Sequence, residues 1–329
     1  NSGTLRYVRV EFAGYATLTD AELNSFTFAA LGSGTTLEYL QSVTGLDDSF
    51  EWFGGTVDGK YLVSYEAGDD HFDTSEGYRG RNQFLIAYQS AFATPRAGAG
   101  AVSTDPQGFE VDGCNGGGCT APAGGNAQSS GAADGLWTMN VFANFTVIGV
   151  GAGVTTPTNG GVGMVLRRGT GGYYVNGVVA RWPRQAISIR DTTSNNRFQV
   201  DSLIVRNLFF ADNGSQNSGV TFDPTSANFG QEAAFTARNS NITLAAGTVT
   251  AASLFTALPA GGTTAPTVAG FDWSPATGSP IATGGLSSFA ADPRIAARVG
   301  MFITPTAYRG AAAPGGTKWW AGWTNYARN

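Results

Sequence analysis

Thr36-Leu-Glu-Tyr-Leu-Gln41 is one copy of a short segment that returns along the first quarter of the chain. The other copies alternate apolar and polar side chains in a similar way: Thr4-Leu-Arg-Tyr-Val-Arg-Val10, Lys60-Tyr-Leu-Val-Ser-Tyr65 and Phe84-Leu-Ile-Ala-Tyr88. A second series lies between them: Ser25-Phe-Thr-Phe28, Ser49-Phe-Glu-Trp52 and His71-Phe-Asp-Thr74. The intervals within each series are mostly 22 to 24 residues, and one is 32. Alternation of this kind over four to seven residues predicts half-buried β-strands.

Two series of strands that share one period predict a solenoid. In such a fold each coil stacks in parallel on the next, and alternate side chains fill a common interior. The expected fold class is therefore all-β, a right-handed parallel β-helix. Later segments continue the pattern with intervals of 28 and 29 residues in the main series. They are residues 145–148, 173–179, 186–189 and 202–205.

The 329 residues are expected to form a single domain with four regions. Residues 1–90 hold the first coils with acidic turns, 91–135 form a long external loop insertion, and 136–220 hold the later coils. Residues 221–329 are irregular and rich in Ala, Gly and Thr, with a short helix at 252–258 and an aromatic C-terminal cap. Because the strand pattern begins almost at once after Asn1, we expect that the N-terminus is trimmed.

Aromatic residues that recur at the coil spacing predict interior stacks, since each coil presents the same positions to the interior. Phe50, Phe72, Tyr61 and Phe84 are assigned to these stacks. A denser aromatic group lies near the end of the chain: Trp319, Trp320, Trp323 and Tyr326. Its two interpretations are a hydrophobic cap that closes the last coil and a platform on which the sugar rings of a glycan stack.

Composition excludes several classes of function. With 19 basic against 24 acidic residues, only two of them lysines, the chain lacks the clustered basic residues of a nucleic-acid-binding protein. A single histidine, His71, excludes a His-rich metal site, and no apolar run is long enough for a transmembrane segment. Cys114 and Cys119 lie in a Gly-rich loop, where we expect a local disulfide. That disulfide and the low lysine content favour secretion.

Acidic residues concentrate in the first coils. Ten of the 24 lie between residues 38 and 76, against a single basic residue, Lys60. The pairs Asp47-Asp48 and Asp69-Asp70 are 22 residues apart, which is one coil. Equivalent carboxylates on stacked strands would face each other about 4.8 Å apart. Like charges at this distance repel one another and raise their pKa values unless something compensates them.

Three kinds of compensation are open at this point. The first is bound Ca²⁺, which takes oxygen ligands; its candidate ligands are Asp47, Asp48, Asp69, Asp70, Asp73 and Glu76. The second is pairing with Arg79 and Arg81, which follow directly. The third is turn chemistry, in which Asp caps the backbone of its own turn. Glu110 or Asp112, inside the predicted insertion, could fold back and join the cluster.

Both ends of the chain resemble a group of bacterial secreted or lipid-anchored right-handed parallel β-helix surface proteins, many of them mislabelled as multidrug transporters. The motifs that carry the resemblance are Ser2-Gly-Thr-Leu-Arg-Tyr-Val-Arg-Val-Glu-Phe-Ala-Gly14, Asp47-Asp-Ser-Phe-Glu-Trp-Phe-Gly-Gly55, Asp69-Asp-His-Phe-Asp73, Gly77-Tyr-Arg-Gly80, Thr304-Pro-Thr-Ala-Tyr-Arg-Gly310 and Gly322-Trp-Thr-Asn-Tyr326. The resemblance implies a location outside the cell or on its outer surface. It implies no activity and carries over no catalytic residue.

The expected function is a non-enzymatic extracellular or cell-surface scaffold for adhesion, assembly or glycan contact, stabilised by calcium on its acidic turns. Exposed end coils also predict homo-oligomers formed by end-to-end or lateral stacking. The alternative is a polysaccharide lyase or hydrolase that acts through the acidic ledge at Asp47, Asp48, Asp69 and Asp70. The Gly-His-Gly and Arg-Ile-Lys segments of pectin hydrolases are absent from the chain, which weakens the enzyme hypothesis.

Overall fold

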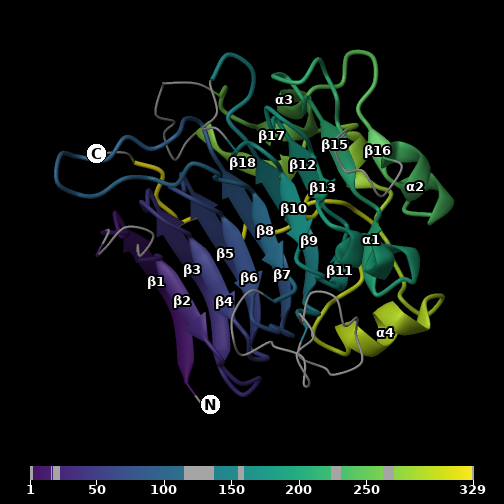
Figure 1. Cartoon of the computed structure of the whole chain (residues 1–329). Helices are drawn as coiled ribbons and strands as arrows, with labels where there is room; N and C mark the ends of the chain where they lie inside the picture. Colours follow the sequence, from purple (N-terminus) through teal and green to yellow (C-terminus); the bar gives the residue numbers. More distant parts are fainter. Residues whose placement is uncertain are drawn as a thin grey trace.

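The computed structural model describes residues 3–15, 17, 23–114, 137–154, 159–223, 231–261 and 270–327 (Figure 1). Two parallel sheets run through it, and their strands alternate along the chain. The coils progress from β1 at one end of the molecule to β16 and α2 at the other (Figure 1). This arrangement confirms the predicted parallel β-helix.

The long-strand sheet contains the main series of strands. Its strands, all in parallel register, are β1 (Thr4–Glu11), β3 (Thr36–Val43), β5 (Asp58–Tyr65), β7 (Arg81–Tyr88), β9 (Val141–Ile148), β11 (Gly172–Val175), β12 (Val178–Ala180), β14 (Leu203–Arg206), β15 (Phe209–Ala211) and β16 (Thr243–Leu244). The short-strand sheet contains the second series. Its strands are β2 (Phe26–Ala29), β4 (Phe50–Phe53), β6 (Phe72–Ser75), β8 (Phe109–Asp112), β10 (Met164–Arg167) and β13 (Ser188–Ile189).

Aromatic rings stack along the interior behind the short-strand sheet. Phe26, Phe50, Phe72 and Phe109 occupy one register position in β2, β4, β6 and β8. Their ring centroids are separated by 4.9, 5.7 and 5.2 Å in turn. The interior assignment of Phe50 and Phe72 is therefore correct, and this column supplies much of the apolar burial that stabilises the coils.

A bend at one position of the long strands places another set of aromatic residues outside the coils. The residue at the bend has a left-handed backbone in successive coils: Tyr7, Tyr39, Tyr61, Phe84, Asn144, Asn176 and Asn207. The first four rings stack with centroids 4.5, 4.5 and 5.3 Å apart, and the three tyrosines contact Trp319 or Trp323 of the C-terminal segment. The interior assignment of Tyr61 and Phe84 was therefore wrong, because a left-handed residue interrupts the alternation of a strand.

The predicted external insertion contains a core strand. β8 pairs in parallel with β6 on one side and β10 on the other, and Phe109 and Val111 are completely buried. The assignment of residues 91–135 to an external loop was therefore wrong for Phe109–Asp112. Four residues suffice here because the short strands of this sheet each contribute only two inward side chains. Residues 115–136, the remainder of that loop with Cys119, lie outside the described residues.

The helices and the remaining strands, some between the later coils and some after them, lie against the flank and the far end of the coils. They are α1 (Thr192–Gln199), α2 (Gln231–Ala237), α3 (Ala251–Leu254), the antiparallel pair β17 (Phe255–Ala257) and β18 (Asp272–Pro275), the 3₁₀ helix η3 (Pro280–Ala282) and α4 (Pro293–Val299). Helix α3 confirms only the start of the short helix expected at 252–258, because the chain continues as strand β17 from Phe255. In the part of the chain that the structure describes, no helix is long and apolar enough to span a membrane.

One interpretation of the C-terminal aromatic group was a cap that closes the last coil. The C-terminal segment does not occupy that position. We call residues 284–326 the strap, because they run along the outer side of the long-strand sheet. Trp323 packs edge-on against Tyr7 and Tyr39, in the first coils, with centroids 6.0 and 5.9 Å apart. Gln41 of β3 both donates to and accepts from the backbone of Asn325, at 2.6 and 2.8 Å. The strap instead covers the apolar outer face of the strands.

Candidate functional site

The outer face of the short-strand sheet carries carboxylates in register. Glu51 of β4 lies beside Asp73 of β6, which lies beside Glu110 of β8. The side chains on either side of each carboxylate along its strand point into the core, so strand alternation turns the carboxylates outward. We call the carboxylate row these three residues together with Asp47, Asp48, Asp69 and Asp70 from the preceding turns.

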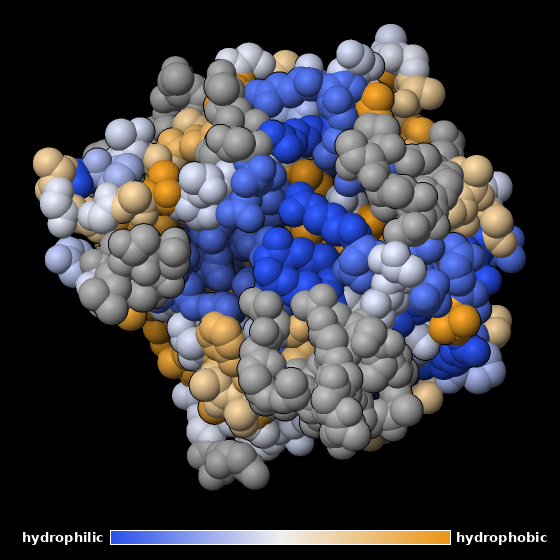
Figure 2. Space-filling model, viewed as in Figure 1, coloured by the Kyte–Doolittle hydropathy of each residue, from blue (hydrophilic) through white to orange (hydrophobic). Residues whose placement is uncertain are grey.

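The carboxylate row falls into three groups whose oxygens lie close enough for one ion. Within each group, one oxygen of every residue lies within 4.8 Å of the others. The groups are Asp47, Asp48 and Asp69; Asp48, Glu51 and Asp73; and Asp70, Asp73 and Glu110. Carboxylate oxygens at this separation suit a hard divalent cation such as Ca²⁺. Figure 2 shows a strongly hydrophilic centre on this face, where Figure 1 labels β8 and β10.

Burial and mutual repulsion make full ionisation of the carboxylate row costly. Burial raises the pKa of Glu51 to about 7, and burial likewise raises the pKa of Glu110 to about 7, although Arg167 opposes the shift. Burial raises the pKa values of Asp48, Asp70 and Asp73 well above their usual range, with neighbouring carboxylates adding to the shift. Full ionisation of the row at neutral pH is therefore unfavourable unless protons or a cation compensate the charge.

Two buried oxygens of the row have no partner among the described residues. They are Oδ1 of Asp69 and Oδ1 of Asp73. A buried carboxylate oxygen without a hydrogen bond or a cation costs free energy, since it has lost its water. Both residues belong to groups that could hold an ion. These two oxygens could therefore accept a hydrogen bond from a ligand or coordinate a cation.

Asp48 and Asp70 have a structural task as well. Asp48 Oδ1 accepts the backbone N–H of Asp70 at 2.8 Å, and Asp70 Oδ1 accepts that of Gln107 at 2.6 Å. Each of these side chains thus joins its own coil to the next. This differs from the turn chemistry that the sequence left open, because each carboxylate caps the backbone of the next coil and not that of its own turn.

The family can now be established. A family model described as a pectate-lyase-like β-helix domain matches residues 1–258. The chain belongs to this family. It has no significant match among curated proteins or solved structures. The remaining question about this pectate-lyase-like β-helix domain is which of its side chains complete the site.

Arginines border the carboxylate row of this pectate-lyase-like β-helix domain on β10. Arg167 forms ion pairs with Glu110 and with Asp112, the latter with Nε and Oδ1 2.8 Å apart. Arg168 also pairs with Asp112. This end of the row is therefore mixed in charge, whereas the end at Asp47 and Asp48 is acidic. A face of this kind can hold a cation and an anionic group side by side.

The predicted compensation by Arg79 and Arg81 was wrong. Arg81 pairs with Asp58, its Nε 3.0 Å from Oδ1, on the long-strand sheet. Within the described ranges Arg79 forms no ion pair. Both residues follow the turn after β6, so the chain has already left the short-strand sheet when it reaches them.

Five of the six predicted calcium ligands lie in the three groups of the carboxylate row. Asp47, Asp48, Asp69, Asp70 and Asp73 come together, while Glu76 is not part of any of the three groups. Glu76 follows β6 and lies 3.8 Å from Cys114 Sγ through its Oε2. Glu51 and Glu110 complete the row instead. Glu51 could have been found from sequence, because it lies 22 residues, or one coil, before Asp73. Whether a cation binds stays a prediction.

The candidate groups outside the row are less accessible. His71 is 1% exposed, with Nδ1 2.5 Å from Ser64 Oγ, and burial lowers its pKa to about 3. Trp320 and Tyr326 are 3% and 1% exposed, so they cannot form the predicted glycan platform. They are buried because these side chains of the strap pack in one apolar cluster with residues of the long-strand sheet, among them Tyr65. Trp319 and Trp323 are only partly buried.

The predicted disulfide cannot be placed from these residues. Cys114 is 2% exposed and packs against Trp137. Cys119 lies outside the described residues, so the pairing of the two stays a prediction.

Proposed function

We propose that this pectate-lyase-like β-helix domain is an extracellular calcium-dependent scaffold that holds acidic polysaccharide on the outer face of its short-strand sheet. The observation that carries the proposal is the carboxylate row, in which three groups of carboxylates overlap and two buried oxygens have no described partner. A bound Ca²⁺ would compensate the buried negative charge and would offer its remaining coordination positions to the carboxylates of a uronate polymer.

The arginines at the other end of the row support the same ligand class. Arg167 already binds two carboxylates of the protein, so its surroundings suit anionic groups. The row extends over β4, β6 and β8, and successive strands lie about 4.8 Å apart. A polymer lying along the coils would therefore meet several equivalent positions. The proposed location of the domain outside the cell is consistent with the predicted disulfide between Cys114 and Cys119.

The first test is a thermal melt in excess calcium and in excess chelator. A ligand at 100 times its dissociation constant stabilises the folded state by about 2.7 kcal/mol, which for a domain of this size is at least a few degrees of midpoint. We expect this shift in the wild type and in Glu38→Gln, a control carboxylate on the long-strand sheet. We expect Asp73→Asn to abolish it. A wild-type midpoint that ignores calcium would contradict the proposal.

The second test is binding of polygalacturonate, measured by isothermal titration calorimetry with and without calcium. The expected result is calcium-dependent binding that Asp73→Asn abolishes and Glu38→Gln retains. Neutral dextran serves as the matched polymer and should not bind. If calcium stabilises the fold but polygalacturonate does not bind, the site is structural and the glycan part of the proposal fails.

One observation favours catalysis as a second candidate. Asp73 and Glu110 hold oxygens within 4.8 Å of each other, and the pKa of Glu110 lies near neutrality. Glycoside hydrolases use two close carboxyl groups, one of which is protonated at neutral pH. A polysaccharide lyase would use an arginine beside bound calcium. Appearance of reducing ends or of ultraviolet-absorbing unsaturated sugars would establish the enzyme. A polymer that binds and is recovered intact supports the scaffold.

A further inference from the structure

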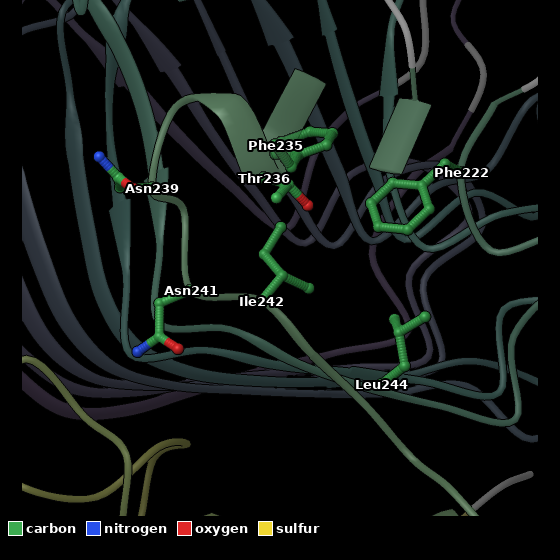
Figure 3. Close-up of a pocket in the computed structure, with 7 residues that line it drawn as sticks. All are labelled: Phe222, Phe235, Thr236, Asn239, Asn241, Ile242 and Leu244. Atoms are coloured by element: carbon green, nitrogen blue, oxygen red, sulfur yellow. The ribbon is translucent and has the colours of Figure 1, made fainter. Parts of the chain in front are cut away.

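A cavity lies at the far end of the coils, away from the carboxylate row. It has a volume of about 360 Å³ and lies between α2 and the last strand, β16. Its lining comprises Phe222, Phe235, Thr236, Asn239, Asn241, Ile242 and Leu244 (Figure 3). In earlier coils the corresponding interior space is filled by side chains of the following coil. Here the coils end and α2 covers the interior only in part.

The walls of this cavity belong to the apolar core. Phe222 and Phe235 are 6% and 2% exposed, and their centroids lie 5.3 Å apart. Phe210 and Phe198 support them from behind, at 5.8 and 4.9 Å. Each of these two rings is therefore held by another ring, while Asn239, Asn241 and Ile242 come from the connection between α2 and β16. A preformed apolar cavity of this size is within the range of small-ligand sites.

The mouth of the cavity is polar but uncharged. Figure 3 shows Asn239 and Asn241 to one side of the space and the hydroxyl of Thr236 beside Ile242. All three polar residues are exposed. Among the described residues, nothing forms a hydrogen bond with the side-chain amides of Asn239 and Asn241, and no lining residue carries a charge. Residues 224–230 and the side chains of 231 and 232 lie outside this description.

We propose that this cavity binds a small uncharged molecule in which an apolar ring carries a hydrogen-bonding group. The ring would lie against Phe222, Phe235 and Ile242, while the polar group would meet the amides at the mouth. Desolvating a charged ligand here would be costly, since no ionic partner lines the walls. The site is separate from the carboxylate row, so it goes beyond the proposed function and does not depend on calcium.

Isothermal titration calorimetry with p-cresol tests the proposal on the full chain. The phenol is neutral at pH 7 because such hydroxyls have a pKa near 10. We expect p-cresol to bind more tightly than toluene, which lacks the hydroxyl, and 4-methylbenzoate, which is charged, not to bind. Absence of p-cresol binding overturns the proposal. If toluene binds as tightly as p-cresol, the polar residues at the mouth do not form a hydrogen bond with the ligand, and that part of the proposal is overturned.

Two variants locate the binding. Ile242→Trp fills the cavity, and Thr236→Trp blocks the mouth from an exposed position of α2 that should tolerate the change. Both should abolish p-cresol binding, whereas Val200→Trp, at a site 58% exposed outside the cavity, should bind as the wild type does. Thermal melts show that each variant is folded. Should Ile242→Trp not fold, Thr236→Trp decides alone. Unchanged binding in a folded variant with a blocked cavity overturns the proposal.

Discussion

Single side chains of the carboxylate row set how the stability of the domain depends on pH. Burial raises the pKa of Glu51 from 4.5 to about 7. A group whose folded-state pKa is raised stabilises the fold below its unfolded pKa, and this contribution is lost as the pH rises through the folded value. For Glu51 the difference corresponds to about 3 kcal/mol between pH 4 and pH 8. His71, whose pKa is lowered to about 3, acts in the opposite direction below pH 6.5.

We therefore expect the calcium-free domain to become more stable as the pH falls from 8 to 6.5, where His71 does not yet oppose the trend. Thermal melts in chelator should show a rising midpoint over this range, and excess calcium should flatten the dependence. Glu51→Gln should flatten it in part. The matched variant Glu38→Gln should retain the wild-type slope. If the melting temperature of the calcium-free domain decreases as the pH is lowered from 8 to 6.5, the row is ionised and its charge is compensated by something other than calcium or protons.

At the scale of the elements, two glutamines hold the strap through both polar groups of their amides. Gln83 of β7 is completely buried and donates to Thr304 O at 2.7 Å while it accepts from Thr304 N at 3.0 Å. Gln41 forms the same double contact with Asn325. A side chain thus reproduces the hydrogen-bond pair of a neighbouring strand. The backbone N–H and C=O groups of Thr304 and Asn325 lose these partners if the amide is removed.

Gln83→Leu should lower the free energy of unfolding by about 1–3 kcal/mol, since the backbone of Thr304 loses both hydrogen bonds and the buried Oδ1 of Asn144 loses a donor 3.1 Å away. Chemical denaturation with urea measures this loss. Gln199→Leu, on the exposed side of α1, is the matched control and should stay within about 0.5 kcal/mol of the wild type. Equal stability of the two variants would mean that water replaces the glutamine without cost.

The elements that repeat were predictable, and those that break the repeat were not. Alternating apolar residues located β3 and β5, because packing in a solenoid places the same chemistry at each coil. Strand β8 was not predicted, because four residues in a Gly- and Ala-rich stretch give too little hydrophobic periodicity. The left-handed bend was not predicted either, since Tyr61 and Phe84 are bulky residues that rarely adopt this backbone. Of the site, the repeated Asp pairs were visible in sequence and Glu110 was named as a residue that could join them, whereas Glu51 was identified only from the strand register.

At the scale of the whole molecule, the strap completes the hydrophobic core on the outer side of the coils. Ile295, Val299 and Ile303 pack on Val141 and Val175, while Trp320 and Tyr326 join a second cluster around Tyr65 and Phe271. The placement of these contacts was not readable from sequence, because they join segments with no common pattern. Each large side chain buried in this way contributes about 1.5–3 kcal/mol.

A chain that ends at residue 283 should therefore lose free energy comparable to the whole of the 5–15 kcal/mol by which a domain is usually stable. We expect it to aggregate or to lose its cooperative melt, as measured by circular dichroism and size-exclusion chromatography. A chain that lacks only residues 327–329 is the control and should melt as the full chain does. A cooperative transition at the wild-type midpoint in the shorter chain would show that the coils are self-sufficient.

The contact between the strap and the first coil determines the order in which the molecule can mature. Arg9 Nη1 donates to the carbonyl oxygen of Trp323 at 3.0 Å although the two residues are 314 positions apart. A ribosome must therefore finish almost the whole chain before the earliest strands receive their cover. Until then the growing polypeptide presents the uncovered face of those strands to its surroundings, which is the situation that chaperones and export machineries serve.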